Sequence, residues 1–165
     1  KACEKRATNI LDILGRKFAF DSTTIPLCLA TIPWAKFCKK KGGVKAHVLY
    51  DIEAQVPTFY TVTAASKHDS TAMRSIPYEP NAYYIFDRAY DSFKELYRIH
   101  LTDSFYVVRA KTNLKYKMVK WKRRMPKNVL TDAEVKLTGY LSEKKYPESF
   151  DTTMKKMVSV LCFPQ

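Results

Sequence analysis

The 165-residue sequence lacks the features of several common protein classes. Its four cysteines are far apart and form no C-x-x-C pair, which argues against a zinc site or a disulfide framework, so we expect free thiols. No apolar run approaches the roughly 18 residues of a membrane span, and the first residues do not have the pattern of a secretion signal. We therefore expect no membrane partner and a cytoplasmic protein.

Acidic residues are scarce relative to basic ones. The chain has 16 Asp and Glu against 29 Lys and Arg, which gives a formal net charge of +13. This imbalance favours a polyanionic partner over an acidic small molecule, and nucleic acid is the leading candidate. Hydrophobic residues make up 46% of the chain, which supports a globular domain with a core.

Two aspartates each follow an aliphatic and aromatic run, Asp21 after residues 18–20 and Asp87 after residues 83–86. A carboxylate at the end of a buried strand is held on a rigid element, and two such groups can share a divalent metal. One aspartate after a strand is usually only a turn or cap residue, so the metal interpretation depends on the pair. We expect the two carboxylates to lie within about 7 Å of each other and to act as metal ligands.

Hydrophobic periodicity predicts three consecutive strands and then a strand, a helix and a strand. The first three strands are expected at residues 17–27, 44–52 and 58–65, as an antiparallel meander. A parallel β-α-β unit is expected to follow, with strands at 82–86 and 104–110 and a helix from the cap Asp91-Ser92 to about Thr102.

Smaller elements complete the expected fold. We predict a helix over residues 3–14 that ends at Gly15, a turn-rich basic connection over 32–43 and a short helix over 70–75. In the longer helix, Phe93, Leu96, Tyr97 and His100 form one stripe, which predicts that His100 lies in the core. From residue 111 the sequence becomes short alternating segments, including 116–121 and 133–137, which indicates a β-rich insertion.

The order of these elements and four short motifs resemble the DDE transposases of bacterial insertion sequences, above all insertion sequence family four. The motifs are Phe20-Asp21-Ser22-Thr23, the segment 41–47, His68-Asp69-Ser70 and the segment 86–90, and the resemblance covers about residues 17–150. It implies an α/β, RNase H-like core at 1–111 in which the first and fourth strands are adjacent. It also implies a β-rich insertion at 112–150, followed by a tail at 151–165 that departs from the family.

The resemblance further implies an activity, which is metal-dependent DNA strand cleavage and strand transfer. Asp21 and Asp87 would hold Mg²⁺ or Mn²⁺, the partners would be transposon ends and target DNA, and the full-length protein would be a possible homodimer. Two other functions stay open, an RNase H-like nuclease outside transposition and a non-catalytic basic DNA-binding remnant.

The family's third acid is a glutamate within a Tyr-x-x-Arg-x-x-x-Glu motif, and this sequence has no clear counterpart. The segment Tyr140-Leu-Ser-Glu143 lacks the arginine, and Glu143 and Glu148 lie beside Pro147. We therefore expect little or no transposition activity from this chain alone, with Glu134, Glu143 or Glu148 as the candidates should activity be found.

The tail suggests an origin for that absence. Reading the codons after Phe150 one nucleotide earlier permits Arg-Tyr-Tyr-Asp-Glu-Glu-Asp-Gly, an alternating strand with a hairpin turn. We therefore hypothesise a frameshift near Phe150, and we expect residues 151–165 to pack loosely.

Two basic stretches are candidates for DNA contact. One surrounds Gly42-Gly43, and the other runs from Arg109 to Lys127 with nine basic residues and no acid. Arg88 and Tyr90 follow the second acid and are expected at the mouth of the site, with Trp121 as a possible stacking platform. The full expected DNA-binding set is Lys39, Lys40, Lys41, Lys45, Arg88, Tyr90, Arg109, Lys111, Lys120, Trp121, Lys122, Arg123 and Arg124.

For several of these residues a structural role is the alternative. A charge run is usually a solvated face, Trp121 is as readily an insertion-core residue, and Tyr90 is as readily a capping aromatic. His47 on a strand is more often a satisfied sheet residue than a ligand, and His68 and Asp69 are more often loop hydrogen-bonding residues than members of a metal site.

Overall fold

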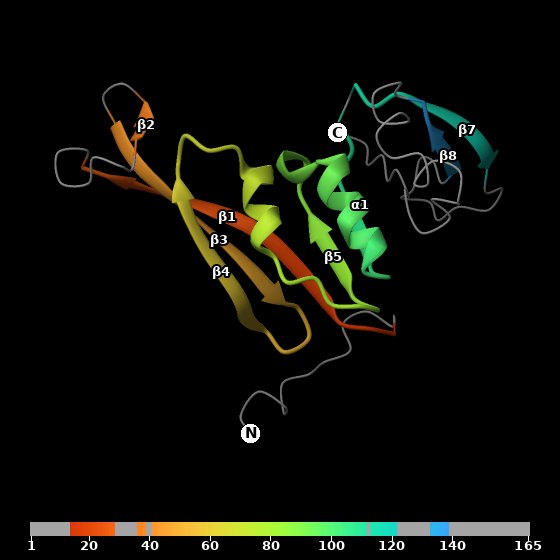
Figure 1. Ribbon diagram of the computed structural model, residues 1–165, viewed down its shortest axis with the longest axis horizontal. Helices are drawn as coiled ribbons and strands as arrows, with labels where there is room; N and C mark the ends of the chain where they lie inside the picture. Colours follow the sequence, from red (N-terminus) through yellow and green to blue (C-terminus); the bar gives the residue numbers. More distant parts are fainter. Residues whose placement is uncertain (1–13, 29–35, 39–40, 112, 122–132, 139–165) are drawn as a thin grey trace, which may run out of the picture.

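The computed structural model describes residues 14–28, 36–38, 41–111, 113–121 and 133–138. A six-stranded mixed sheet carries helices on one face, and a separate two-stranded sheet follows it in the chain (Figure 1). The α/β class expected from the sequence is therefore confirmed. No helix among the described residues combines the length and the hydropathy that crossing a membrane requires.

The described elements follow the chain in an order close to the expected one. They are β1 (Lys17–Leu27), β2 (Lys36–Cys38), β3 (Lys41–Asp51), β4 (Val56–Ala64), the 3-10 helix η2 (Asp69–Ser75), β5 (Tyr83–Phe86), the single 3-10 turn η3 (Arg88–Tyr90), α1 (Phe93–Leu101), β6 (Phe105–Val108), β7 (Tyr116–Trp121) and β8 (Ala133–Leu137).

The sheet combines an antiparallel and a parallel half. β3 pairs antiparallel with β1 and with β4, which confirms the predicted meander. β1 also pairs parallel with β5, and β5 pairs parallel with β6, so the strand order is β4-β3-β1-β5-β6 with β2 added beside β3. The first and fourth predicted strands, now β1 and β5, are therefore neighbours, as expected.

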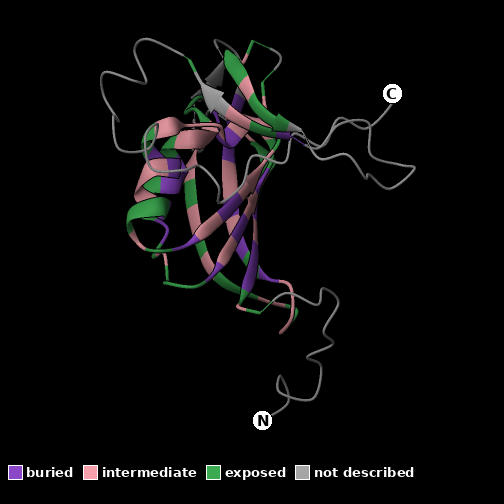
Figure 2. Cartoon of the chain, turned by 90° about the vertical axis from the view of Figure 1, so that its right-hand side faces the viewer, coloured by how far each residue is buried: buried purple, intermediate pink, exposed green. Residues whose placement is uncertain are grey.

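The core lies between the sheet and the helices η2 and α1. Phe18 and Phe20 of β1 and Tyr84 and Phe86 of β5 point to this face, where buried and more exposed positions alternate along the strands (Figure 2). The rings of Phe18 and Tyr84 stack with their centroids 5.3 Å apart. Burial of each such side chain contributes about 1.5–3 kcal/mol, so this aromatic layer holds β1 and β5 together.

The opposite face of the sheet is more open. Tyr50 of β3 and Tyr60 and Val62 of β4 are exposed there, and Tyr60 keeps 76% of its surface accessible. By strand alternation this is also the face of the odd-numbered residues at the start of β1. Asp21 therefore lies on a face that also exposes the large hydrophobic side chains of Tyr60 and Val62.

Three local predictions were wrong in detail. β2 forms within the stretch expected to be a turn-rich connection, because its short backbone segment pairs with the start of β3. The helix expected over 70–75 is a 3-10 helix that begins at Asp69. His100 is exposed, since α1 buries Glu95, Leu96 and Ile99 instead.

The buried Glu95 shows why the helix is rotated from the expected stripe. Its carboxylate lies 3.1 Å from the Arg98 guanidinium, which also donates hydrogen bonds to the carbonyl oxygens of Met73, Arg74 and Ile76. The Arg98 guanidinium lies over the ring of Tyr78 as well, 4.6 Å from its centroid. These contacts fix α1 against η2 and keep the buried carboxylate paired.

Gly15 marks the entry to β1. Its φ of +109° lies in a region that favours glycine, and a Cβ there would overlap the carbonyl oxygen of Asn81. The helix expected over 3–14, apart from its last residue, lies outside the described residues, as does the tail at 151–165. The expected strands at 116–121 and 133–137 are present as β7 and β8, which pair antiparallel.

Candidate active site

The two aspartates each follow one of a pair of register partners on neighbouring parallel strands. Phe20 of β1 is the register partner of Phe86 of β5. Asp21 directly follows Phe20, and Asp87 directly follows Phe86. Neighbouring strands are about 4.7–4.9 Å apart, so the pairing brings the two acidic residues side by side. β1 continues to Leu27, so Asp21 does not lie at the end of its strand. It does directly follow Phe20, the last residue of β1 that pairs with β5.

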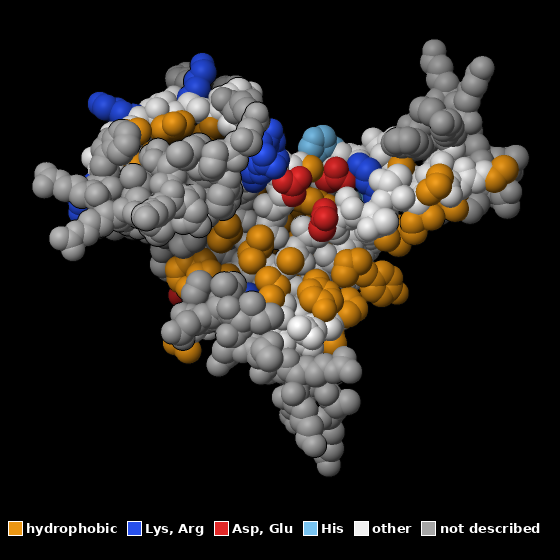
Figure 3. Space-filling model, turned by 180° about the vertical axis from the view of Figure 1, so that it is seen from behind, with side chains coloured by type: hydrophobic (Ala, Val, Ile, Leu, Met, Phe, Trp, Pro, Cys, Tyr) orange, Lys and Arg blue, Asp and Glu red, His pale blue; other side chains and the backbone are white. Residues whose placement is uncertain are grey.

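Both acidic side chains belong to the open face. Phe20 and Phe86 point into the core, and strand alternation turns the residue after each of them the other way. Asp87 keeps an extended backbone at φ −78° and ψ 170°, so the alternation continues past the end of β5. Asp21 and Asp87 are both exposed. Seen from behind, acidic side chains gather beside a histidine and between basic side chains (Figure 3).

A buried polar network lies behind the acids, on the core side of the sheet. His47 of β3 is fully buried, with its Nδ1 3.4 Å from the Tyr90 hydroxyl and its Nε2 2.9 Å from the Thr63 hydroxyl. The Tyr90 hydroxyl shares a hydrogen bond with the side chain of Ser22 as well. The prediction that His47 is a satisfied sheet residue is therefore confirmed.

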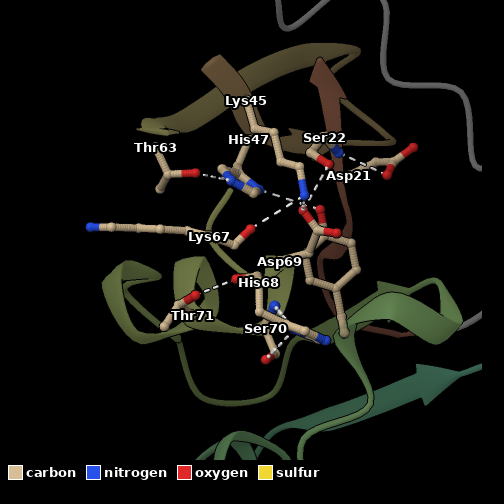
Figure 4. Close-up of polar contacts among 11 residues, drawn as sticks. Asp21, Ser22, Lys45, His47, Thr63, Lys67, His68, Asp69, Ser70 and Thr71 are labelled. Atoms are coloured by element: carbon tan, nitrogen blue, oxygen red, sulfur yellow. Dashed lines mark hydrogen bonds and ion pairs between the residues drawn. The ribbon is translucent and has the colours of Figure 1, made fainter. Parts of the chain in front are cut away.

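An ion pair completes this network (Figure 4). Lys45 of β3 lies 2.9 Å from the carboxylate of Asp69, and both side chains are largely buried. Lys45 also donates a hydrogen bond to the carbonyl oxygen of Lys67, and the hydroxyl of Ser22 lies 3.5 Å from Asp69. Together these contacts connect β1, β3 and the start of η2 just beside Asp21.

Burial shifts the pKa of two groups in the network. Burial lowers the pKa of His47 below its usual range, although the negative charges of Asp69 and Asp21 favour the protonated imidazole and act to raise it. It raises the pKa of Tyr90 to about 12, where the hydrogen bond from Ser22 acts in the opposite direction and the charges of Asp69, Asp21 and Asp87 add to the rise. At neutral pH His47 is therefore an uncharged imidazole and Tyr90 an uncharged phenol.

His68 has a structural role in the same region. Its ring accepts a hydrogen bond from the backbone N–H of Ser70 at the start of η2, and its carbonyl oxygen accepts one from the backbone N–H of Thr71. This agrees with the loop hydrogen bonding expected for His68. Among the described residues, no group of three or more His, Cys, Asp or Glu side chains is arranged to hold a metal ion.

The residues expected to bind DNA are in different environments. Lys45 forms an ion pair with Asp69, and its side chain is largely buried. Tyr90 is only 1% exposed. Neither side chain is therefore presented to solvent as a DNA contact. Arg88 is half-buried, and its Nε is buried with no hydrogen-bond partner in the described part of the chain. Arg109 and Lys111 are exposed, and Lys111 donates a hydrogen bond to the carbonyl oxygen of Asp91.

The second basic stretch is described in part. Lys115, Lys117 and Lys120 are exposed in or beside β7, and Lys120 is the register partner of Glu134 on β8. Lys41 is the first residue of β3, and Trp121 is the last residue of β7. The expected residues outside the described part are Lys39, Lys40, Lys122, Arg123, Arg124, Glu143 and Glu148.

Sequence reasoning did not find the residues that build the network. From the sequence, Ser22 is a member of the motif at residues 20–23, Thr63 is a residue of the strand expected at 58–65, and Lys45 belongs to the basic stretch around Gly42-Gly43. The sequence did contain a signal for two of these residues. Ser22 follows Asp21 on a strand and Tyr90 lies one turn after Asp87, so both side chains point to the core, away from the acids.

Comparison with known proteins gives consistent results. A profile of the family described as "Transposase DDE domain" matches residues 14–159, which extends into the tail beyond Phe150. A protein of Sinorhizobium fredii named "Putative transposase y4zB" is 36% identical over 103 residues, which are 62% of this chain and 29% of that protein. A protein of Geobacillus stearothermophilus named "Probable transposase for insertion sequence element IS5377" is 31% identical over 96 residues, 57% of this chain and 25% of that protein.

The chain thus spans less than a third of the length of these two curated relatives. No solved structure matches it.

Proposed function

Because this chain belongs to the transposase DDE domain family, we propose that it supplies the first two metal-binding acids of an enzyme that cleaves and joins DNA at the ends of an insertion sequence. The observation that carries the proposal is the placement of Asp21 and Asp87 after register partners on adjacent parallel strands. Two exposed carboxylates side by side repel each other, and a bound cation removes that repulsion.

The fold proposed for this domain is RNase H-like. The support is the sheet order β4-β3-β1-β5-β6, in which an antiparallel meander is followed by a parallel β-α-β unit. This order places the first and fourth strands of the series next to each other. We further propose that the hairpin of β7 and β8 belongs to an insertion at residues 112–150.

The donor set fits Mg²⁺ or Mn²⁺. Carboxylate oxygens are hard ligands, and Mg²⁺ usually binds through one or two carboxylates while keeping several waters. When bound, such metals stabilise the attacking and leaving oxygens of an in-line phosphodiester displacement. Asp21 and Asp87 would hold the metal, and no side-chain nucleophile is needed.

The basic residues would bind the DNA backbone. Arg88 directly follows Asp87 and is half-buried, and its Nε has no hydrogen-bond partner among the described residues. Its guanidinium would donate to a phosphate oxygen close to the metal. The described part of the basic stretch consists of five exposed residues, Arg109, Lys111, Lys115, Lys117 and Lys120. We propose that this stretch contributes weakly sequence-selective, electrostatic affinity, because no base-reading helix motif accompanies it.

We also propose that the chain alone does not complete the catalytic site. The two acids come from β1 and β5, and Glu134 lies opposite Lys120 on the separate hairpin. The third acid would lie in a region that corresponds to the part of the curated relatives outside the match with this chain. Strand transfer by the purified 165-residue chain would contradict this part of the proposal.

Metal binding tests the site without requiring catalysis. Mn²⁺ titration followed by electron paramagnetic resonance should show one class of site in the 165-residue chain that Asp21→Asn or Asp87→Asn weakens at least about tenfold. The matched control is Asp103→Asn, because Asp103 is exposed with φ +55°, a conformation that asparagine also tolerates. Equal Mn²⁺ affinity in all four proteins would remove the assignment of Asp21 and Asp87.

A further inference from the structure

The hydroxyl of Tyr90 is a polar group placed deep in an aromatic core. The Tyr90 ring packs against Phe20 and Phe86, with centroid separations of 5.1 and 6.2 Å. A phenylalanine would make the same ring contacts without the cost of burying a hydroxyl. The hydroxyl is therefore explained by its polar partners, Ser22 and His47, and not by packing.

These partners connect the two acid-bearing segments through a continuous path. The backbone N–H of Tyr90 donates to the carbonyl oxygen of Asp87 at 3.0 Å, which closes the single turn η3. The Tyr90 hydroxyl hydrogen-bonds the side chain of Ser22 on β1. The backbone N–H of Ser22 in turn donates to a carboxylate oxygen of Asp21 at 2.7 Å. Tyr90 and Ser22 together thus join the carboxylate of Asp21 to the backbone that carries Asp87.

The other end of this path is anchored. His47 holds the Tyr90 hydroxyl from β3 and is itself held by Thr63 on β4, while Asp69 lies within reach of the Ser22 hydroxyl and is neutralised by Lys45. The β1 and β5 strands pair only up to Phe20 and Phe86, so their ladder does not extend to the acids themselves. After Phe20 and Phe86, it is Tyr90 that hydrogen-bonds the segment carrying Asp87 to the segment carrying Asp21, among the residues that the structure describes.

We propose that Tyr90 is a positioning residue that sets the geometry of Asp21 relative to Asp87 for a shared divalent metal, through its hydroxyl and Ser22. The inference rests on the proposed function, since it assumes that the two acids bind the metal. Tyr90 does not touch the metal or the DNA. It acts through the chain segments on both sides of the site, and His47 supports it from β3.

The experiment compares Mn²⁺ affinity with stability in matched variants of the 165-residue chain. Tyr90→Phe removes the hydroxyl and keeps the ring. The control is Tyr84→Phe, which removes another fully buried hydroxyl, one that accepts a hydrogen bond from the backbone N–H of Glu79 and is not part of the path. Ser22→Ala breaks the same path at a less buried position, and the double variant tests whether the two residues act together.

The expected result is a loss of Mn²⁺ affinity of about tenfold in Tyr90→Phe and in Ser22→Ala, near the lower end of the cost of losing an outer-shell partner. The double variant should lose little more than either single variant. Tyr84→Phe should shift the urea unfolding midpoint about as much as Tyr90→Phe and leave Mn²⁺ affinity unchanged.

Two outcomes overturn the inference in distinguishable ways. If Tyr90→Phe binds Mn²⁺ like the unmodified chain, or if Tyr84→Phe weakens binding equally, Tyr90 has only a packing role. If Asp21→Asn and Asp87→Asn do not change Mn²⁺ binding, the metal site itself is absent, and the proposed function fails before the role of Tyr90 is in question.

Discussion

Phe20 and Phe86 are register partners in the parallel pair of β1 and β5, and each is followed by an exposed aspartate. The two phenylalanines pack edge to face in the core with their centroids 6.2 Å apart. The two phenylalanines thus face one side of the sheet, and the aspartate that follows each of them faces the other side. Apolar packing, which needs no metal, therefore brings together two like charges that do not attract each other.

This adjacency predicts a disulfide between Asp21→Cys and Asp87→Cys. Neighbouring strands about 4.7–4.9 Å apart fall within the Cα separation of about 4.4–6.8 Å that a disulfide accepts. After the four native cysteines are replaced by serine, mild oxidation should link the two tryptic peptides, as detected by mass spectrometry. The control pair Asp21→Cys and Glu79→Cys should not link, because Glu79 precedes the opposite end of β5. An equally efficient control link would contradict the observed register.

Replacing Lys120, Lys122, Arg123 and Arg124 together by alanine should flatten the salt dependence of DNA affinity. Each phosphate contact on a duplex adds about 0.9 to the slope of log affinity against log salt, so four contacts predict a decrease of about 3 to 4. Fluorescence anisotropy with a labelled duplex at several salt concentrations measures the slope. Lys94→Ala, an exposed position on α1, is the control. An unchanged slope in the fourfold variant would identify the cluster as a solvated face.

His47 should make the folded protein less stable in mild acid. Burial lowers its pKa in the folded state, so the unfolded chain takes up a proton first as the pH falls below about 6.5. The free energy of unfolding should therefore decrease from about pH 7 toward the lowered pKa and then level off. The charged and titratable groups that contact the imidazole or act on it electrostatically are Asp69, Asp21, Lys45 and Tyr90.

Urea unfolding at several pH values checks this dependence. In His47→Gln the decrease across this window should be smaller, while His100→Gln, at an exposed position, should retain the full decrease. A full decrease in His47→Gln would assign the acid sensitivity to another group.

Arg98→Ala should destabilise the fold by about 2 to 3 kcal/mol. The substitution removes the donor to three carbonyl oxygens of the η2 region and leaves the buried carboxylate of Glu95 with a single, more distant arginine, Arg74. Arg98 is 37% exposed, which keeps the expected cost below that of a fully buried pair. The urea midpoint measures the change, and Lys94→Ala on the same helix should stay within about 0.5 kcal/mol of the unmodified chain.

The sequence predicted the strands of the sheet better than the details of the site. The runs before Asp21 and Asp87 are strongly apolar, and their strand character is independent of the rest of the chain. The exposure of His100 could not be predicted in this way, because α1 rotates to bury Ile99 and the paired Glu95. β2 was missed because a strand of three residues has too few positions to show a period.

The polar network was missed for a different reason. Ser22, Lys45 and Tyr90 come from segments far apart in the chain, and none forms a local motif with its partners. Their contacts exist only because β1 lies between β3 and β5. Lys45 and Tyr90 were therefore assigned by residue type to DNA contact, although their surroundings give them structural partners.

The single turn between Asp87 and Tyr90 sets a constraint on chain length. Its backbone hydrogen bond spans three residues, and that span brings the phenol to Ser22. An insertion or deletion of one residue between them would rotate the tyrosine away from the core even though Asp87 and Tyr90 themselves are unchanged. Chains of this family that rely on the same link should therefore tolerate a substitution of Ala89 more readily than any change in the number of residues between the aspartate and the tyrosine.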